Sequence, residues 1–139
     1  MVIDQPQPRG LPGAARLKRP IDFKAVYAAR QSVASGPLVF YGRQRTDVGA
    51  PTRLGLSVSR RVGNAVVRNR WKRRLREVFR LVRQDLPAGV DLVVIVRASG
   101  PPEAGAPAAR RIEQLMRDGV ARLVNKMKRA AGQTGLRSD

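Results

Sequence analysis

Residues 64–83, NAVVRNRWKRRLREVFRLVR, contain the pattern that decides the fold. At 3.6 residues per turn, the apolar side chains of this stretch fall on one arc of a helix and the basic ones on the opposite arc. The apolar arc consists of Val67, Trp71, Leu75, Val78 and Val82, and the opposite arc holds Asn69, Lys72, Arg73, Arg76 and Arg80. Asn64 can cap the helix, because its side-chain oxygen can accept from a free amide of the first turn. We therefore expect an amphipathic helix from Asn64 to about residue 83.

The positive charge of the chain is concentrated on this helix and the loop before it. The chain of 139 residues carries 28 lysines and arginines against 10 aspartates and glutamates, a net charge of +18. Residues 60–83 hold ten of the basic side chains and a single acidic one, which is half of the net charge. Like charges four residues apart destabilise a bare helix by a few tenths of a kcal/mol per pair. A merely solvated face is therefore disfavoured, and the charge predicts a polyanionic partner.

The spacing and type of the basic residues favour folded RNA as that polyanion. Arg68, Lys72 and Arg76 follow one another at intervals of four, so their tips lie about 6 Å apart along the helix axis. This spacing is comparable with that of phosphates along a nucleic-acid strand. Arginine predominates, and its planar guanidinium can bridge two phosphate oxygens or stack on an exposed base, which an ammonium group cannot do.

The composition also excludes several classes of function. The sequence contains no cysteine, which removes disulfides, thiolate nucleophiles and the usual ligands of zinc fingers. It contains no histidine, so a Ser-His-Asp or Cys-His catalytic arrangement is impossible and a stand-alone nuclease is disfavoured. No stretch approaches the roughly 20 apolar residues of a membrane-spanning helix, and residues 1–10 lack the apolar core of a signal peptide. We expect a cytoplasmic protein that does not contact membranes.

Three stretches have the pattern of β-strands, at residues 38–45, 53–59 and 92–96. In the first, Leu38 and Phe40 alternate with Val39, Tyr41, Arg43 and Arg45. In the second, leucine and valine alternate with Gly55, Ser57 and Ser59, so that the other face of this strand is nearly bare. The third is a continuous apolar run, typical of a central buried strand, and we expect it to pair with residues 53–59.

Two further helices and two tails complete the expected α+β domain. Phe23, Val26 and Tyr27 share one face of a short helix that begins at Asp22 and is ended by residues 32–36. Apolar residues between positions 112 and 127 predict a last amphipathic helix, in which Gly119 is a weak point. The expected organisation is a disordered N-terminal segment at residues 1–16, one domain at residues 17–131 and a flexible tail at residues 132–139.

The sequence LSVSRRVGNAVVRNRWKRRLR, residues 56–76, resembles the signature of bacterial ribonuclease P proteins, whose hallmark is an Arg-Asn-Arg helix. Residues 16–27 resemble the first helix of that family and residues 91–97 its last strand, so that the resemblance covers about residues 16–130. A basic helix alone would be weaker support, since ribosomal proteins also have one. A ribosomal or other structural RNA-binding protein is therefore the alternative.

The resemblance implies a fold that periodicity alone does not predict. Family members have the element order α-β-β-β-α-β-α, arranged as a sandwich of one sheet and packed helices. Their third and fourth strands are parallel and joined by a left-handed βαβ crossover, the fold named after the second domain of a small-subunit ribosomal protein. Nearly all crossovers of this kind are right-handed.

The resemblance also implies a function, that of the protein subunit of an endoribonuclease whose catalytic subunit is RNA. The subunit would form a 1:1 complex with ribonuclease P RNA and assist removal of the 5′ leader of precursor tRNA, with Mg²⁺ held mainly by the RNA. The implied surface for the catalytic RNA comprises Arg60, Arg61, Asn64, Arg68, Asn69, Arg70, Lys72, Arg73 and Arg76. The implied cleft for the single-stranded leader comprises Phe23, Tyr27, Tyr41, Ser57 and Ser59.

Plainer explanations exist for some of these residues. Phe23 and Tyr27 could simply pack the first helix on the sheet, whereas as a cleft wall they would stack on bases above the small residues of strand 53–59. Trp71 lies on the apolar arc, and we interpret it as a core residue. Asp85 and Asp91 are not paired in a way that suggests a metal site.

Overall fold

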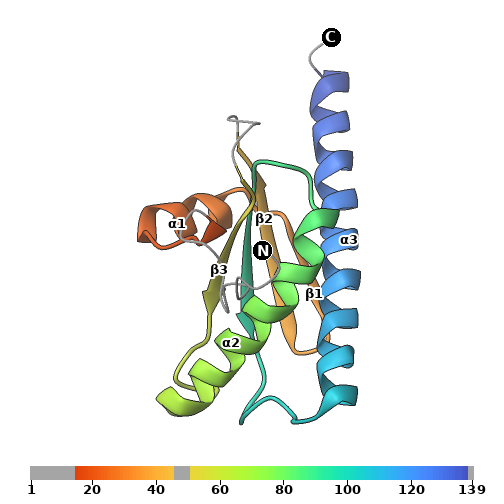
Figure 1. The fold of residues 1–139 in the computed structure, drawn as a ribbon. Coiled ribbons are helices and arrows are strands. Elements are labelled where there is room, and N and C mark those ends of the chain that lie inside the picture. The colour runs from red at the N-terminus through yellow and green to blue at the C-terminus, as the bar shows by residue number, and fades with distance from the viewer. Residues whose placement is uncertain (1–14, 46–50, 138–139) are drawn as a thin grey trace, which may run out of the picture.

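The structure, a computed structural model, describes residues 15–45 and 51–137, with side chains up to residue 131. Figure 1 shows the arrangement of its elements. They are α1 (Pro20–Ala28), β1 (Ser32–Ser35), β2 (Leu38–Gln44), β3 (Arg53–Ser57), α2 (Ala65–Val82), the short 3₁₀ turn η3 (Arg83–Asp85), β4 (Val90–Val96) and α3 (Ala106–Arg137). The order of helices and strands confirms the expected α-β-β-β-α-β-α domain. No helix in the described ranges is both long enough and apolar enough to cross a membrane.

The four strands form one mixed sheet in the order β1-β2-β4-β3. β3 and β4 are parallel, with Arg53 opposite Asp91 and Ser57 opposite Ile95, while the other neighbours are antiparallel. The predicted pairing of the last strand with residues 53–59 is therefore confirmed. In Figure 1, β3 and β4 both run downward, β4 lies to the right of β3, and α2 crosses in front of them. This connection is the rare left-handed crossover.

The two faces of the sheet carry different layers. One face supplies Phe40, Leu54 and Leu92 to the main core. α2 and α3 pack over this face and cover the core. The other face carries a smaller cluster in which Val26 of α1 and Val93 of β4 are buried. The alternation predicted for β2 is confirmed, because Phe40 belongs to the main core and Tyr41 to the small cluster. The protein thus has α2 on one side of the sheet and α1 on the other.

Strand β1 was not predicted from the residues, which assigned positions 32–36 to the end of the first helix. Its four residues, Ser-Val-Ala-Ser, have little strand pattern of their own. Gly36, with φ of 57°, turns the chain tightly so that Ser35 pairs with Leu38 of β2. α3 covers the strand, where Arg122 and Lys126 donate to backbone carbonyls of β1 at 2.9 and 2.8 Å. The hairpin and α3 therefore provide what the local sequence does not.

Gly119 lies where α3 packs closely against the sheet. We expected it to be a weak point of the helix, and this interpretation is wrong, because α3 continues through it. A Cβ atom there would lie 2.3 Å from Cε2 of Phe40, a separation that no packed side chain tolerates. The glycine lets α3 approach β2 more closely than any other residue would. α3 itself continues to Arg137, past the domain boundary expected at residue 131.

The folded part begins earlier than the expected boundary at residue 17. Ala15 is buried, Arg16 forms a parallel bridge with Leu54, and the Leu17 amide donates to the Leu54 carbonyl at 2.9 Å. α1 begins at Pro20, two residues before the expected start, because proline suits the first turn of a helix. The expectation of disorder covers residues 1–16, of which residues 1–14 lie outside the described residues.

Candidate nucleic-acid interface

The amphipathic character of α2 is confirmed in detail. Trp71, Leu75, Val78 and Val82 of the predicted arc are buried, and Phe79 joins them. The side chain of Asn64 accepts a hydrogen bond from the Val67 amide at 3.0 Å, as expected of a cap. Trp71 is a core residue, because its side chain is buried and its Nε1 donates to the Gly100 carbonyl at 2.8 Å. α2 is therefore fixed by one face and presents its basic residues on the others.

One flank of α2 carries Arg68, Lys72 and Arg76, which are all half-buried. Burial, and after it the nearby guanidinium of Arg16, lower the pKa of Arg76. The Nε of Arg68 is buried and has no hydrogen-bond partner among the described residues. This flank thus combines like charges in close proximity with a donor that lacks an acceptor. A phosphate group would relieve both costs.

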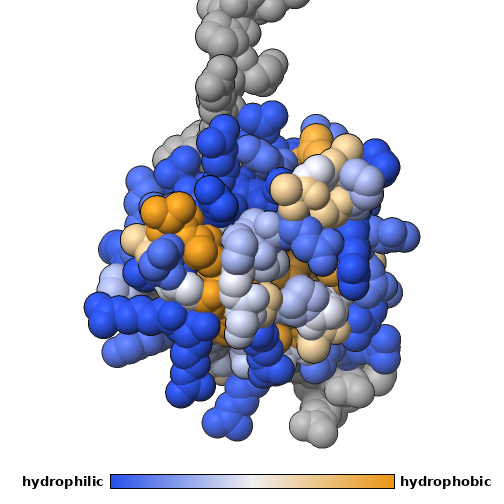
Figure 2. Space-filling view, turned by 90° about the horizontal axis from the view of Figure 1, so that it is seen from below, coloured by the Kyte–Doolittle hydropathy of each residue, from blue (hydrophilic) through white to orange (hydrophobic). Residues whose placement is uncertain are grey.

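The other flank carries Arg70, Arg73 and Arg74, which line a groove against Pro102 in the loop after β4. Arg73 also pairs with Glu77 at 3.2 Å, but both side chains are exposed, so this pair contributes little. Figure 2 looks from below at the end of the molecule where α2 and α3 begin, and most of that surface is hydrophilic. The structure therefore divides the predicted RNA-binding residues of α2 between two flanks.

The remaining predicted RNA-binding residues lie at the start of α2 or on its outer face. Arg60 and Arg61 are exposed in the turn that precedes the helix. Asn69 is exposed on the helix, and Asn64 is exposed although its side-chain oxygen is engaged as the cap. These positions leave the turn and the N-terminal half of α2 accessible to a large partner.

Four of the five residues expected in the leader cleft lie together on the opposite face of the sheet. The rings of Tyr27 and Tyr41 meet edge to face, with centroids 5.1 Å apart and planes at 89°. Phe23 belongs to the same cluster, and Ser57 forms a hydrogen bond with Tyr27. Burial raises the pKa of Tyr27, and the Ser57 hydrogen bond opposes this only in part, so the hydroxyl is neutral at physiological pH. Ser59 is exposed, beyond the end of β3.

The interpretation of Gly55 as bare cleft floor is wrong. A Cβ atom on Gly55 would lie 2.7 Å from Cζ of Phe23 and 3.1 Å from Cβ of Leu17. The space above the glycine is therefore occupied by the first helix and the segment before it. Phe23 packs on the sheet, as the plainer explanation held, yet its side chain remains half-buried. Ser57, two residues further along β3, remains partly accessible beside Tyr27.

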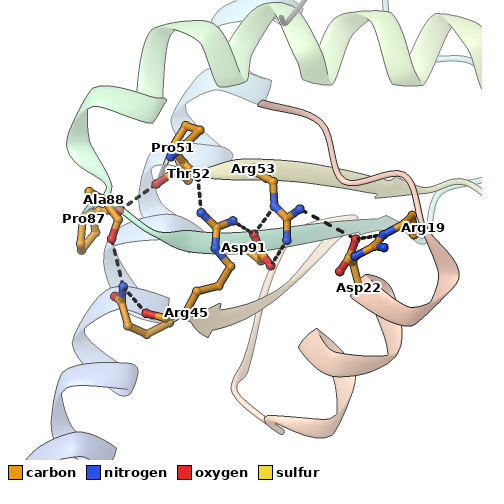
Figure 3. A network of polar contacts seen from close by, with 10 residues as sticks. Arg19, Asp22, Arg45, Pro51, Thr52, Arg53, Pro87, Ala88 and Asp91 are labelled. Carbon is orange, nitrogen blue, oxygen red and sulfur yellow. Dashed lines mark hydrogen bonds and ion pairs between the residues drawn. The ribbon is translucent and has the colours of Figure 1, made fainter. Parts of the chain in front are cut away.

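A buried ion network, which sequence reasoning missed, fixes α1 to the sheet (Figure 3). Asp91 of β4 is fully buried between two arginines. Arg45 donates to one of its oxygens, and Arg53 of β3 binds both, at 2.8 Å each. Arg53 also approaches Asp22 of α1 at 3.8 Å, and Asp22 accepts from Arg19 at 3.2 Å. The register of Arg53 with Asp91 was the one signal that could have revealed this network.

Asp22→Asn is expected to lower stability at neutral pH only. The hydrogen bond from Arg19, more than any other interaction, holds the pKa of Asp22 below its usual value. A carboxyl with a depressed folded-state pKa stabilises the fold above its unfolded pKa of about 3.9, and this contribution is lost as the pH falls. Urea unfolding at pH 7 should show a loss of up to about 1 kcal/mol. The two proteins should converge below pH 3, and a difference that persists there would contradict the assignment.

The acidic residues of the described ranges do not fit a magnesium site. No three histidine, cysteine, aspartate or glutamate side chains gather there in a way that could hold a metal ion. Asp91 is neutralised by two arginines, and Asp85 pairs with Arg117 at 2.7 Å. Carboxylates with arginine partners are poor ligands for a cation that demands near-ideal oxygen geometry.

The chain is similar to known proteins of one family. The model of the family described as Ribonuclease P matches residues 11–129. A protein of Brevibacillus brevis named "Ribonuclease P protein component" is 40% identical over 115 residues, which is 83% of this chain and 82% of that protein. The RNase P protein of Staphylococcus aureus has a similar structure, with a TM-score of 0.60 and 31% identity over 83% of this chain and 96% of that one. The RNase P protein of Thermotoga maritima gives a TM-score of 0.56 and 28% identity over 78% and 93%.

Proposed function

Because the chain belongs to the ribonuclease P protein family, we propose that it binds two RNAs on two surfaces. α2 binds the catalytic RNA of ribonuclease P. The aromatic cluster formed by Phe23, Tyr27 and Tyr41 binds the 5′ leader of precursor tRNA. One observation carries the proposal. Residues 60–83, which comprise α2 and its flanking residues and carry half of the net positive charge, lie on one side of the sheet, and a partly exposed aromatic cluster lies on the other. Two RNA molecules could therefore contact the protein simultaneously.

The surface for the catalytic RNA consists of α2 and the turn before it. Folded RNA presents phosphates on several strands, and a helix with basic residues on both flanks can contact more than one of them. Arg68, whose Nε has no hydrogen-bond partner in the described part of the chain, and Arg76, beside Arg16, are the best placed to bind phosphate. The apolar arc keeps the helix rigid, so that little freedom is lost when the RNA binds.

The surface for the leader consists of Tyr27, Tyr41, Phe23 and Ser57. Single-stranded RNA is recognised by aromatic side chains on which unstacked bases can lie, and such stacking tolerates any sequence. The neutral hydroxyl of Tyr27 can also donate a hydrogen bond to a phosphate or base oxygen. Such a surface would accept leaders that differ in sequence. Mature tRNA lacks the leader, so this surface should distinguish precursor from product.

The proposed division of labour assigns the cleavage chemistry to the RNA. The chain has neither histidine nor cysteine, and its described carboxylates do not form a metal site. Mg²⁺ would therefore be held mainly by the RNA, and a 1:1 complex of protein and RNA, located in the cytoplasm, would be the working enzyme. A ribosomal or other structural RNA-binding role would explain the basic residues of α2 but would not explain the partly exposed aromatic cluster.

Reconstitution with ribonuclease P RNA tests the proposal. The protein should enable precursor-tRNA cleavage at Mg²⁺ concentrations at which the RNA alone is slow, because its positive charge replaces part of the cation atmosphere. The complex should also bind precursor tRNA more tightly than mature tRNA. Equal affinity for the two tRNAs would exclude the leader surface, and failure to bind the RNA would exclude the function altogether.

Tyr27→Ala should weaken binding of precursor tRNA to the reconstituted complex by about tenfold and leave mature tRNA unaffected. Loss of one stacked base costs about 1–3 kcal/mol. Tyr27→Phe keeps the ring against Tyr41 and should retain most of the preference. Ile21→Ala is the matched control, since Ile21 is exposed on the same helix and lies outside the aromatic cluster. Equal losses for both tRNAs would indicate a general change in fold.

A further inference from the structure

A pocket beside α2, on the side of the sheet away from the leader surface, has no role in the function proposed so far. It is a cavity of about 210 Å³ between α2, the loop of residues 97–105 and the first turns of α3. Its walls include Trp71, Pro101, Pro102, Ile112 and Leu115, with Ser99, Glu103 and Arg111 as polar groups. Figure 2 faces this end of the molecule, where hydrophobic residues are visible between hydrophilic ones. Because drug-sized ligands need about 300–1,000 Å³, this cavity suits a single flat ring system.

The loop that forms one wall of the pocket is held by hydrogen bonds at its start and at Gly100. The Gly100 carbonyl accepts from Nε1 of Trp71 at 2.8 Å, and its amide donates to the Val62 carbonyl at 2.7 Å. Gly100 has φ of 84°, a conformation that side chains other than glycine rarely adopt. The Arg97 amide donates to the Pro37 carbonyl at 2.8 Å at the start of the loop. The pocket is therefore preformed, and a ligand would not have to order it.

The pocket adjoins the groove on the second flank of α2. Pro102 and Glu103 line both cavities, so the loop forms a ridge between them. The groove carries Arg70, Arg73 and Arg74. Glu77 also lines it and pairs with Arg73, which leaves the guanidiniums of Arg70 and Arg74 for phosphates. A nucleotide with its phosphate in the groove would reach across the ridge, and its base would enter the pocket.

Glu103 is the residue that identifies the base. It forms no hydrogen bond or ion pair with any residue in the described part of the chain. The other carboxylates of that part all pair with arginines, namely Asp22, Glu77, Asp85, Asp91, Glu113 and Asp118. A carboxylate next to an RNA-binding groove repels phosphates, unless a base donates hydrogen bonds to it. Guanine alone among the four bases presents two adjacent donors, N1–H and N2–H, that match the two oxygens of a carboxylate.

We propose that this pocket binds an unpaired guanine of the RNA whose backbone lies in the arginine groove of α2, with Glu103 accepting from N1–H and N2–H. The proposal rests on the proposed RNA-binding function of α2 and adds base recognition to it. Arg111, which also lines the pocket, would offer its guanidinium to the O6 or N7 acceptors of the same base.

The single tryptophan of the chain gives a direct test, because Trp71 lines the pocket. The probes are pentauridylates whose central nucleotide is guanosine, inosine, adenosine or uridine, added to the full-length protein at fixed salt. We expect the guanosine probe to quench Trp71 fluorescence and to bind about tenfold more tightly than the adenosine probe. Inosine, which lacks the N2 amino group, should be intermediate. Binding by anisotropy without a change in Trp71 emission, or equal affinities for guanosine and adenosine, would overturn the proposal.

Variants separate base recognition from charge. Glu103→Gln should abolish the preference for guanosine. The affinity for the guanosine probe should fall, since its two donors lose the carboxylate, while the affinity for the adenosine and uridine probes stays equal or rises, since a repulsive charge is lost. Glu113→Gln removes the same charge from α3, outside both cavities, and should retain the preference. Ala108→Leu should fill the pocket and remove the quenching, with the thermal midpoint verifying that the variant folds. If it does not fold, the Glu103 and Glu113 pair decides alone.

Failure of this proposal and failure of the proposed function are distinguishable. Reconstituted precursor-tRNA cleavage with no guanosine preference in the oligonucleotide assay would overturn the pocket and leave the function intact. Absence of binding to any probe and to ribonuclease P RNA would overturn both.

Discussion

Replacement of Arg68, Lys72 and Arg76 by alanine should reduce the affinity for ribonuclease P RNA about 100-fold at physiological salt. Each phosphate that a protein neutralises adds about 0.7–0.9 to the slope of log affinity against log salt, so three lost contacts lower the slope by roughly 2–3 units. The effect should be large on this flank, because its side chains are half-buried and the Arg68 Nε has no partner among the described residues. Nitrocellulose filter binding over a salt series measures both quantities.

A matched variant distinguishes this surface from general charge. Arg110, Lys128 and Arg129 are exposed on α3, and their replacement by alanine removes the same three charges. This control should change the slope by less than one unit, because distant charges are screened beyond about 10 Å at ordinary ionic strength. If the two triple variants flatten the salt dependence equally, the RNA responds to the net charge of the protein and α2 has no special role.

The main features of α2 were predictable because they are local. Its apolar arc, its Asn64 cap and its charged surface depend on residues within a few positions of one another, and a period of 3.6 reveals them. The strands β2, β3 and β4 were likewise visible from alternation or from a continuous apolar run. The left-handed crossover was expected only from family resemblance, since base rates favour the opposite hand.

The features that were missed or misjudged depend on contacts between distant positions. Gly119 is required because the ring of Phe40 lies against it. Gly55 is not accessible because the ring of Phe23 lies over it. No local pattern connects the members of either pair. β1 is held by its pairing with β2 and by α3, whose side chains donate to its carbonyls. A helical wheel gives the angle of each arginine around α2. It does not show the groove of Arg70, Arg73 and Arg74, because Pro102, which completes this groove, lies about thirty positions further along the chain.

Asp91→Ala should be the most destabilising single substitution among those considered, with a loss of about 3–5 kcal/mol in the free energy of unfolding. Asp91 is fully buried, and its removal would leave the guanidiniums of Arg45 and Arg53 without their carboxylate. The remaining positive charges would repel each other in a poorly solvated site. For a domain of this size the loss could approach half of the total stability. Guanidinium chloride unfolding, followed by far-UV circular dichroism, measures it.

Asp85→Ala is the control for Asp91→Ala, because Asp85 also pairs with an arginine but in an exposed site. Its loss should be at most about 1 kcal/mol. A second comparison also removes one of the two positive partners of Asp91. Arg53→Met combined with Asp91→Leu should recover part of the lost stability, since the apolar pair leaves one unmatched charge, Arg45, instead of two. If Asp91→Ala costs no more than Asp85→Ala, water must enter the site. The network would then not fix α1, and the position of Tyr27 beside the sheet would depend on apolar packing alone.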